Sequence, residues 1–248
     1  MTIALRDSVA HVFVDDLTAP TLSDDDQHHL ARVLRVRDGE SVSASDGRGG
    51  WRLCQWLDGR LDAASDVQHV AAPAPRIGVA FVPVKGDRPE WAVQKLTEIG
   101  VDDIVVLAPT RRAVVRWGDD KHLRKLQVVA REAAMQSRRV WLPTITGPVS
   151  LAEVCARPGA AVADPAGEPL NIGPFDAGTR DSAARDASAP SPATSIIIIG
   201  PEGGFDADEL TPSVHRVSLG DTILRAETAT LVAATLLATL RNRMKGPQ

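Results

Sequence analysis

The sequence of 248 residues is poor in the residue types that mark several classes of protein. Its two cysteines, Cys54 and Cys155, form no Cys-x-x-Cys motif, which excludes a disulfide framework and a zinc ribbon. No apolar run reaches the ~18 residues that a membrane span needs. Arg6 and Asp7 interrupt the N-terminal stretch, so that it does not resemble a signal peptide. These absences predict a cytoplasmic protein without a membrane partner.

An excess of positive charge is also lacking, since the net charge is −4. The charges are nevertheless segregated along the chain. Residues 73–144 contain 13 basic and 8 acidic residues, whereas residues 1–72 and 145–248 carry net charges of −5 and −4. Positive potential gathered in one segment attracts a polyanion even when the whole chain is acidic. A solvated helix face with ion pairs is the alternative interpretation.

The first part of the chain favours short strands that alternate with turns. One strand is expected on each side of the turn Asp46–Gly50, and an alternating stretch precedes them at residues 10–16. The Pro-containing segment 71–76 has the composition of a stiff linker. We therefore expect residues 1–72 to form a small β-barrel domain.

One helix interrupts these strands. Ser23 and Asp26 have the spacing of a capping box, and a run of aspartates suits the positive end of a helix dipole. A period of 3.6 residues places Leu30, Val33 and Leu34 on one face, which we expect to be buried.

From Ile77 onward, buried-type strands alternate with amphipathic helices, a pattern typical of a doubly wound parallel sheet. Residues 176–195 have neither period and are rich in Ala, Ser, Asp and Pro, so we expect a flexible surface excursion there. The expected strands are 77–84, 101–109, 159–167, 196–199 and 215–220, and the expected helices are 89–100, 121–139 and 228–243. The last helix is apolar around most of its circumference, which predicts cover either within the domain or from a second subunit.

Three loops follow expected strands, at the edge of a parallel sheet where ligands bind. They are ADPAG (163–167), GPEGGF (200–205) and LGDTILRAETA (219–229). Glycine lets a ligand approach the main chain, but none of these loops has a lysine, and Glu202 would repel a phosphate. Such a pocket suits S-adenosylmethionine, which has a sulfonium cation, a ribose and no phosphate.

These loops resemble a known family. The segment IIGPEGGF followed by LGDTILRAETA, with KGDRPEWAVQKLTEIGV before them, closely resembles the RsmE family of ribosomal RNA methyltransferases, of the SPOUT class. HHLARVLRVRDGE is similar to the family's RNA-binding, PUA-like barrel. The resemblance implies an α/β SPOUT fold over residues 73–248 with a C-terminal trefoil knot. It also implies methylation of N3 of a uridine in the small-subunit (16S) RNA, or in the 30S particle, by a homodimer formed through the C-terminal helix.

The resemblance also implies where S-adenosylmethionine binds and which residues act on the uridine. N3 carries a proton at neutral pH, so it is a poor nucleophile until a base removes that proton. Arg225 is the candidate to stabilise negative charge on the uracil oxygens, and Glu227 to accept the proton with Glu202 behind it. Alternatively, Glu227 caps the last helix and pairs with Arg225. The candidate donor-binding residues are Ala163, Asp164, Pro165, Ile199, Gly200, Pro201, Gly203, Gly204, Leu219, Gly220, Leu224, Thr228 and Ala229.

RNA contact is expected from basic residues of both parts of the chain. Adjacent histidines diverge on a helix and no third ligand follows them, so the pair His28–His29 is not a metal site. A polar helix face is the alternative to phosphate contact. The candidate RNA-binding residues are His28, His29, Arg32, Arg35, Arg111, Arg112, Arg116, Arg138 and Arg139.

Two other functions stay open at this point. A SPOUT enzyme could act on transfer RNA or on a ribose 2′-hydroxyl, although the barrel together with LRAETA favours the uridine-N3 family. A protein that binds RNA and assists ribosome assembly without catalysis could use the barrel and the basic segment alone. Binding of S-adenosylmethionine distinguishes such a non-catalytic assembly protein, which would not bind it, from the uridine-N3 enzyme and from the alternative SPOUT enzyme.

Overall fold

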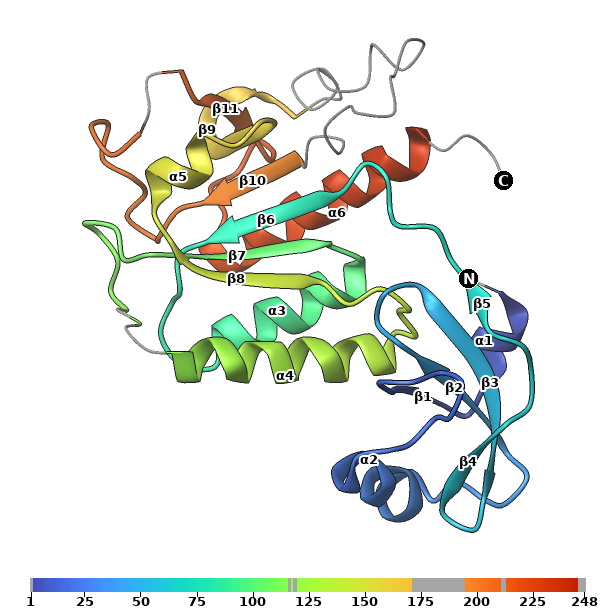
Figure 1. The fold of residues 1–248 in the computed structure, drawn as a ribbon. Helices are drawn as coiled ribbons and strands as arrows, with labels where there is room; N and C mark the ends of the chain where they lie inside the picture. The colour runs from blue at the N-terminus through green and yellow to red at the C-terminus, as the bar shows by residue number, and fades with distance from the viewer. Residues whose placement is uncertain (1, 116, 118–119, 171–194, 211–212, 245–248) are drawn as a thin grey trace. The chain divides into compact units, whose positions relative to one another are not determined.

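The computed structural model describes residues 2–115, 117, 120–170, 195–210 and 213–244 (Figure 1). The expected excursion at 176–195 lies outside them, except for Ser195. The chain divides into two compact units. The first consists of Met1–Ala72 with Arg131–Leu142, and the second of Pro73–Ala130 with Pro143–Gln248. Among the described helices, none is both long and apolar enough to cross a lipid bilayer.

The first unit is built on a five-stranded sheet in the order β1-β2-β3-β4, with β5 also paired to β3. β1 and β2 are parallel, and the other pairs are antiparallel. The expected turn joins β2 to β3, and the Asp46 carboxylate accepts hydrogen bonds there from the backbone of Arg48 and Gly50. The strands are β1 (Ala10–Phe13), β2 (Ser41–Ser45), β3 (Gly50–Leu57), β4 (Arg60–Ala63) and β5 (Gln68–His69), and a short helix α1 (Ile3–Asp7) precedes them.

The expected helix begins where its cap predicts. Ser23 accepts a hydrogen bond from the Asp26 backbone and donates one to its carboxylate, at the start of α2 (Asp24–His28). The helix continues as a π-helical turn, η1 (His29–Leu34). Leu30 is buried, but Val33 and Leu34 are 61% and 48% exposed, so the expectation of one buried face was wrong for these two. π-helical winding changes the angle between successive side chains, and the period of 3.6 residues no longer applies.

The second unit contains a six-stranded parallel sheet in the order β11-β9-β10-β6-β7-β8 (Figure 1). Its strands are β6 (Ile77–Phe81), β7 (Asp103–Leu107), β8 (Thr144–Val149), β9 (Ala160–Pro169), β10 (Ser195–Ile199) and β11 (His215–Ser218). Its helices are α3 (Arg88–Ile99), α4 (Asp120–Gln136), α5 (Leu151–Cys155) and α6 (Ala226–Met244). The last residues of α4, from Arg131, belong to the first unit. The doubly wound sheet inferred from the sequence is therefore confirmed.

Alternate residues of the central strands serve two cores. Ile197 and Ile199 of β10 pack in one cluster with buried side chains of α3, α4 and α6. Ile196 and Ile198 pack in another, with Leu151 and Val154 of α5. Both faces of β10 are therefore covered, which explains its four consecutive isoleucines.

β8 and α5 were not expected from the sequence. β8 is an edge strand that contains Gly147 and Pro148, and its residues alternate between buried or half-buried and exposed positions. Proline is tolerated at the edge of a sheet, because one side of an edge strand donates no ladder hydrogen bond. α5 has only five residues, too few to show a helical period.

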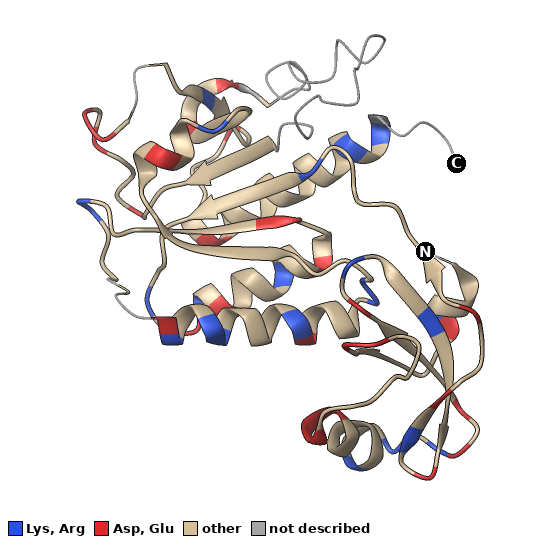
Figure 2. Ribbon diagram, viewed as in Figure 1, with Lys and Arg blue, Asp and Glu red and all other residues tan. Residues whose placement is uncertain are grey.

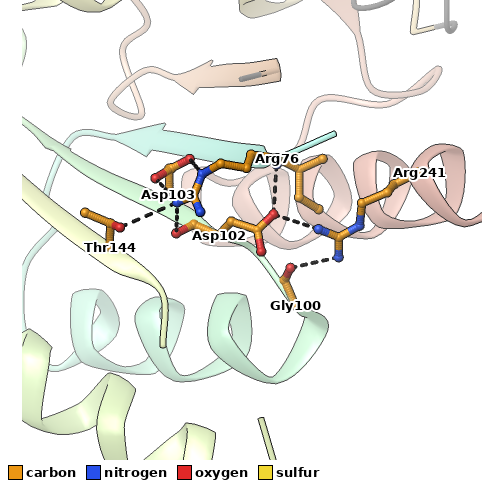
Figure 3. Close-up of polar contacts among 7 residues, drawn as sticks. Arg76, Gly100, Asp102, Asp103, Thr144 and Arg241 are labelled. Carbon is orange, nitrogen blue, oxygen red and sulfur yellow. Dashed lines mark hydrogen bonds and ion pairs between the residues drawn. The ribbon is translucent and has the colours of Figure 1, made fainter. Parts of the chain in front are cut away.

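Two ion pairs fix the amino ends of the central strands in the second unit (Figure 3). Arg241 of α6 donates to the Asp102 carboxylate at 2.7 Å and to the Gly100 carbonyl at 3.0 Å. The same Asp102 carboxylate accepts from the Ile77 backbone at 3.0 Å. Beside it, Arg76 forms a forked pair with Asp103 and lies within reach of Thr144. The pair Arg241–Asp102 is almost fully buried, with 10% and 3% of the side chains exposed.

We expect Arg241→Met to lower the free energy of unfolding by about 3 kcal/mol, because it leaves the buried Asp102 carboxylate without its cationic partner. Urea denaturation measures this change. The matched control is Arg243→Met in the same last turn of α6, where the side chain is exposed. A loss no larger than that of the control would contradict the assigned role of the pair.

A buried histidine makes the first unit sensitive to pH. His11 of β1 is 2% exposed, its Nε2 donates to the Arg139 carbonyl at 3.1 Å, and its Nδ1 accepts from the Ser43 hydroxyl at 2.8 Å. Burial lowers the pKa of His11 from 6.5 to about 4, although the hydrogen bond to Arg139 opposes this shift. Between these two pKa values the unfolded chain binds more protons than the folded chain, so stability falls as the pH falls.

From pH 7 to pH 5 we therefore expect the unfolding free energy to decrease by about 2 kcal/mol through His11. The measurement is urea denaturation at both pH values for the native chain and for His11→Gln. Glutamine does not titrate, so the variant should show a smaller dependence on pH. An equal slope for the two proteins would show that His11 does not cause it.

Candidate active site

A cavity of about 380 Å³ opens at the carboxyl edge of the parallel sheet in the second unit. Its walls come from β9 and from the segments after β10 and β11. Residues 163–167 bulge out of β9, because the pairing with β11 jumps from Val162 to Glu168. The predicted donor-binding residues in the wall are Ala163, Asp164, Pro165, Ile199, Gly200, Pro201, Gly204, Leu219, Gly220, Leu224 and Ala229. Gly203 and Thr228 do not line it, and the candidate Glu202 does.

Several lining residues were not selected from the sequence. Arg216 of β11 donates to the Asp164 carboxylate at 2.9 Å, so the cavity contains a cation that the three loop motifs do not show. Ile223 lies in the wall although its side chain is 89% exposed. The alternation of β11 could have indicated the side on which Arg216 lies, but not its partner. The others are Val162, Phe205, Ala207, Leu210, Thr222 and Ala226.

The two candidate carboxylates share a cation that sequence reasoning missed. Arg88, the first residue of α3, lies 3.5 Å from a carboxylate oxygen of Glu202 and 3.5 Å from one of Glu227. Glu202 follows β10 and Glu227 is in the first turn of α6, so Arg88 joins segments that are far apart in the sequence. Arg88 belongs to the motif KGDRPEW, which could have marked it as a candidate site residue. No sequence pattern predicts the carboxylates with which it pairs.

The two oxygens of Glu227 differ in their surroundings. Oε1 faces Arg88, whereas Oε2 is buried and accepts no hydrogen bond from the described residues. A buried acceptor without a donor is costly unless a ligand or a water molecule satisfies it, and Glu90 Oε2 of α3 is a second such oxygen. Arg225, two residues earlier, is exposed, and no ion pair joins its guanidinium to a described side chain. The alternative pairing of Arg225 with Glu227 is therefore not present here.

The candidate RNA-binding residues fall into two groups. His28, His29, Arg32 and Arg35 are all exposed on or directly after α2 and η1. Others are bound within their own unit: Arg138 is half-buried and donates to the backbone carbonyls of Arg6 and Ser8. Arg139 is also half-buried. Arg116 lies outside the described residues.

Arg111 and Arg112 are exposed but paired. They follow β7 and bind acidic residues of the segment after β10. Figure 2 shows Lys and Arg along α4 as well, and one of them, Lys125, pairs with Glu90 of α3 at 2.6 Å. Part of the positive charge in residues 73–144 is thus neutralised by neighbouring carboxylates.

Two known protein families match parts of this chain. The RNA methyltransferase domain matches residues 72–238, and the RNA methyltransferase PUA domain matches residues 22–55. The chain belongs to this family of RNA methyltransferases. Ribosomal RNA small subunit methyltransferase E of Mycobacterium bovis is 32% identical over 88% of this chain and 86% of its own length.

Solved structures share the fold. A probable rRNA-methyltransferase from Porphyromonas gingivalis is 28% identical, with a TM-score of 0.71 over 95% of this chain and 99% of that one. The ribosomal RNA small subunit methyltransferase E of Neisseria gonorrhoeae, bound to S-adenosyl methionine, is 24% identical, with a TM-score of 0.66 over 93% and 97% of the two chains. The fold is therefore of the SPOUT type, with a PUA domain before the parallel sheet. The trefoil knot stays a prediction.

Proposed function

We propose that this chain transfers a methyl group from S-adenosylmethionine to N3 of a uridine in the RNA of the small ribosomal subunit. The observation that carries the proposal is the cavity at the sheet edge, formed by the three predicted loops. Glu227 directly follows the lining residue Ala226 without lining the cavity itself, and one of its carboxylate oxygens is buried without a hydrogen-bond partner among the described residues. The relatives named ribosomal RNA small subunit methyltransferase E support the choice of RNA.

The lining fits the methyl donor. A volume of about 380 Å³ is within the range of small-molecule sites. Gly200, Gly204 and Gly220 expose main chain to a ligand, and the Asp164 carboxylate lies in the same wall as an acceptor for hydroxyl groups. Arg216 neutralises part of that negative charge, and the wall contains a second carboxylate, that of Glu202, which Arg88 neutralises in part. S-adenosylmethionine supplies an electrophilic methyl group when it is bound there.

The chain's own residues prepare the uridine. We infer that Glu227 Oε2 accepts the N3 proton, since it is a buried carboxylate oxygen that no described donor satisfies and it follows Ala226 of the cavity wall. Arg88 holds the other oxygen and so fixes the direction of the carboxylate. As the proton leaves, negative charge spreads onto the uracil oxygens, where the unpaired guanidinium of Arg225 would stabilise it. Glu202 is 62% exposed and is the weaker candidate for a base.

The division of labour between the units is also a proposal. We assign RNA binding to residues 1–72, where exposed basic residues gather on α2 and η1, and methyl transfer to residues 73–248. Half-buried apolar residues remain on α6, among them Leu231, Val232, Leu236 and Leu240, and they support a homodimer formed through this helix. We also propose a cytoplasmic location, because the proposed substrate is ribosomal, as naked RNA or as the 30S particle.

We expect Glu227→Gln to reduce methylation of small-subunit RNA by about a hundredfold or more, because the amide keeps the shape but cannot accept the proton. The assay uses 30S particles from cells that lack the protein. Reverse transcription stops at N3-methyluridine, since the methyl group blocks base pairing, and it therefore maps the product.

The matched control is Glu202→Gln, at the other carboxylate near Arg88, for which we expect a smaller loss. Binding of S-adenosylmethionine by calorimetry should be the same for Glu227→Gln as for the native chain. Full methylation by Glu227→Gln would remove Glu227 from the mechanism. A product on a ribose hydroxyl or on transfer RNA would overturn the proposed substrate.

A further inference from the structure

Two loops at the carboxyl edge of the sheet are joined by charged side chains. We call Gly200–Leu210 the β10 loop. Most of its residues line the cavity, among them Gly200 at one end and Leu210 at the other. The arginine loop, Thr110–Arg112, follows β7 and contributes none of the lining. The inference drawn from their contacts rests on the proposed function, since it concerns the loop that would hold the methyl donor.

The β10 loop has few hydrogen bonds between its own residues. Backbone hydrogen bonds within this loop are local: the Gly204 backbone donates to the Pro201 carbonyl at 2.8 Å, and the Glu209 backbone donates to the Asp206 carbonyl at 3.0 Å. Phe205 and Leu210 anchor it in the apolar core. The polar contacts that join it to the rest of the described second unit run to the arginine loop and to Arg88.

Arg112 spans this loop with one guanidinium group. Its Nη1 donates to the Gly203 carbonyl at 2.5 Å, and its Nη2 lies 2.5 Å from the Asp206 carboxylate. The side chain also packs on Gly203, where an added Cβ would lie 3.1 Å from the Arg112 Cδ. Gly203 does not line the cavity, and a side chain at this position would make Arg112 shift by a few tenths of an ångström.

Arg111 completes the connection. Its backbone N donates to Glu209 Oε1 at 2.9 Å, and Glu209 Oε2 accepts from the Asp206 backbone at 3.0 Å. Its guanidinium binds both oxygens of Asp208, at 2.8 and 2.6 Å. The hydrogen bond to Asp208 raises the pKa of Arg111, and the same contact lowers the pKa of the Asp208 carboxyl.

We propose that Arg112 is a positioning residue that holds the β10 loop in the shape that binds S-adenosylmethionine. Exposed ion pairs contribute little to global stability. A loop is different, because its alternative shapes are close in free energy and a few contacts select among them. Both terminal nitrogens of Arg112 contact the loop. The positioning role therefore competes with the prediction that Arg112 contacts RNA.

The test is a double-mutant cycle on binding of S-adenosylmethionine, measured by calorimetry at low ionic strength. We expect Arg112→Ala and Asp206→Ala each to weaken binding by about tenfold, and the double variant to lose less than the product of the two losses, because the Arg112–Asp206 contact is removed in all three. Arg124→Ala removes an exposed arginine of α4 and should leave the affinity unchanged. Equal melting temperatures show that the variants are folded.

RNA affinity, measured by filter binding with small-subunit RNA and without the methyl donor, separates the two roles of Arg112. The positioning role predicts that Arg112→Ala changes RNA affinity no more than Arg124→Ala does. A phosphate contact predicts a loss for Arg112→Ala and a gain for Asp206→Ala, which removes a negative charge.

Two results would overturn the inference. One is a loss of RNA affinity in Arg112→Ala while the affinity for S-adenosylmethionine is unchanged. The other is full additivity of the two substitutions in the cycle. If the native chain itself binds no S-adenosylmethionine, the proposed function fails, whereas native binding that the variants retain removes only the role of Arg112.

Discussion

Parallel pairing is the constraint on which the second unit depends. Neighbouring parallel strands need a crossover between them, so all their carboxyl ends meet at one edge of the sheet. β10 pairs in parallel with β9 on one side and β6 on the other. The bulge of β9 and the segments that follow β10 and β11 are thereby brought together, although residues 163 and 229 are far apart in the sequence. A cavity lined by three short motifs is the direct result.

The charges of this edge are organised by pairing rather than by excess. Residues 73–144 carry a surplus of positive charge, but Arg76, Arg111 and Arg112 are each bound to carboxylates of the second unit. Arg131 is likewise bound to Asp26 in the first unit, at 2.6 Å. A count of basic residues therefore overstates the positive charge available to a polyanion. Arg32 of η1 and Arg35 directly after it are exposed and have no such partners among the described residues, which supports the proposal that they contact RNA.

Much of this architecture could be read from the sequence, for identifiable physical reasons. The four isoleucines of β10 predict a strand buried on both faces, and Gly100 ends α3 in the left-handed conformation with φ 102°. The capping residues of α2 predict its start. Edge strand β8 was not predicted, because its Gly147-Pro148 pair resembles a turn. The exposure of Val33 was not predicted either, because the π-helical turn has another period.

The site shows the same division. Loops that expose glycine main chain are visible as motifs, and eleven of thirteen predicted residues line one cavity. Side-chain partners across the fold are not visible, because pairing with Arg88 or Arg216 depends on where tertiary packing directs each long side chain. Sequence spacing contains that information only within one helix or strand.

Glu227 illustrates how one residue can be both structural and chemical. It lies in the first turn of α6, where a carboxylate is favoured by the helix dipole and where a purely capping role would suffice. Its two oxygens separate these roles. Oε1 lies 3.5 Å from the Arg88 guanidinium, whereas Oε2 is buried without a donor among the described residues. Capping alone does not account for an unsatisfied buried oxygen, and this asymmetry supports the proposal that Glu227 accepts the proton.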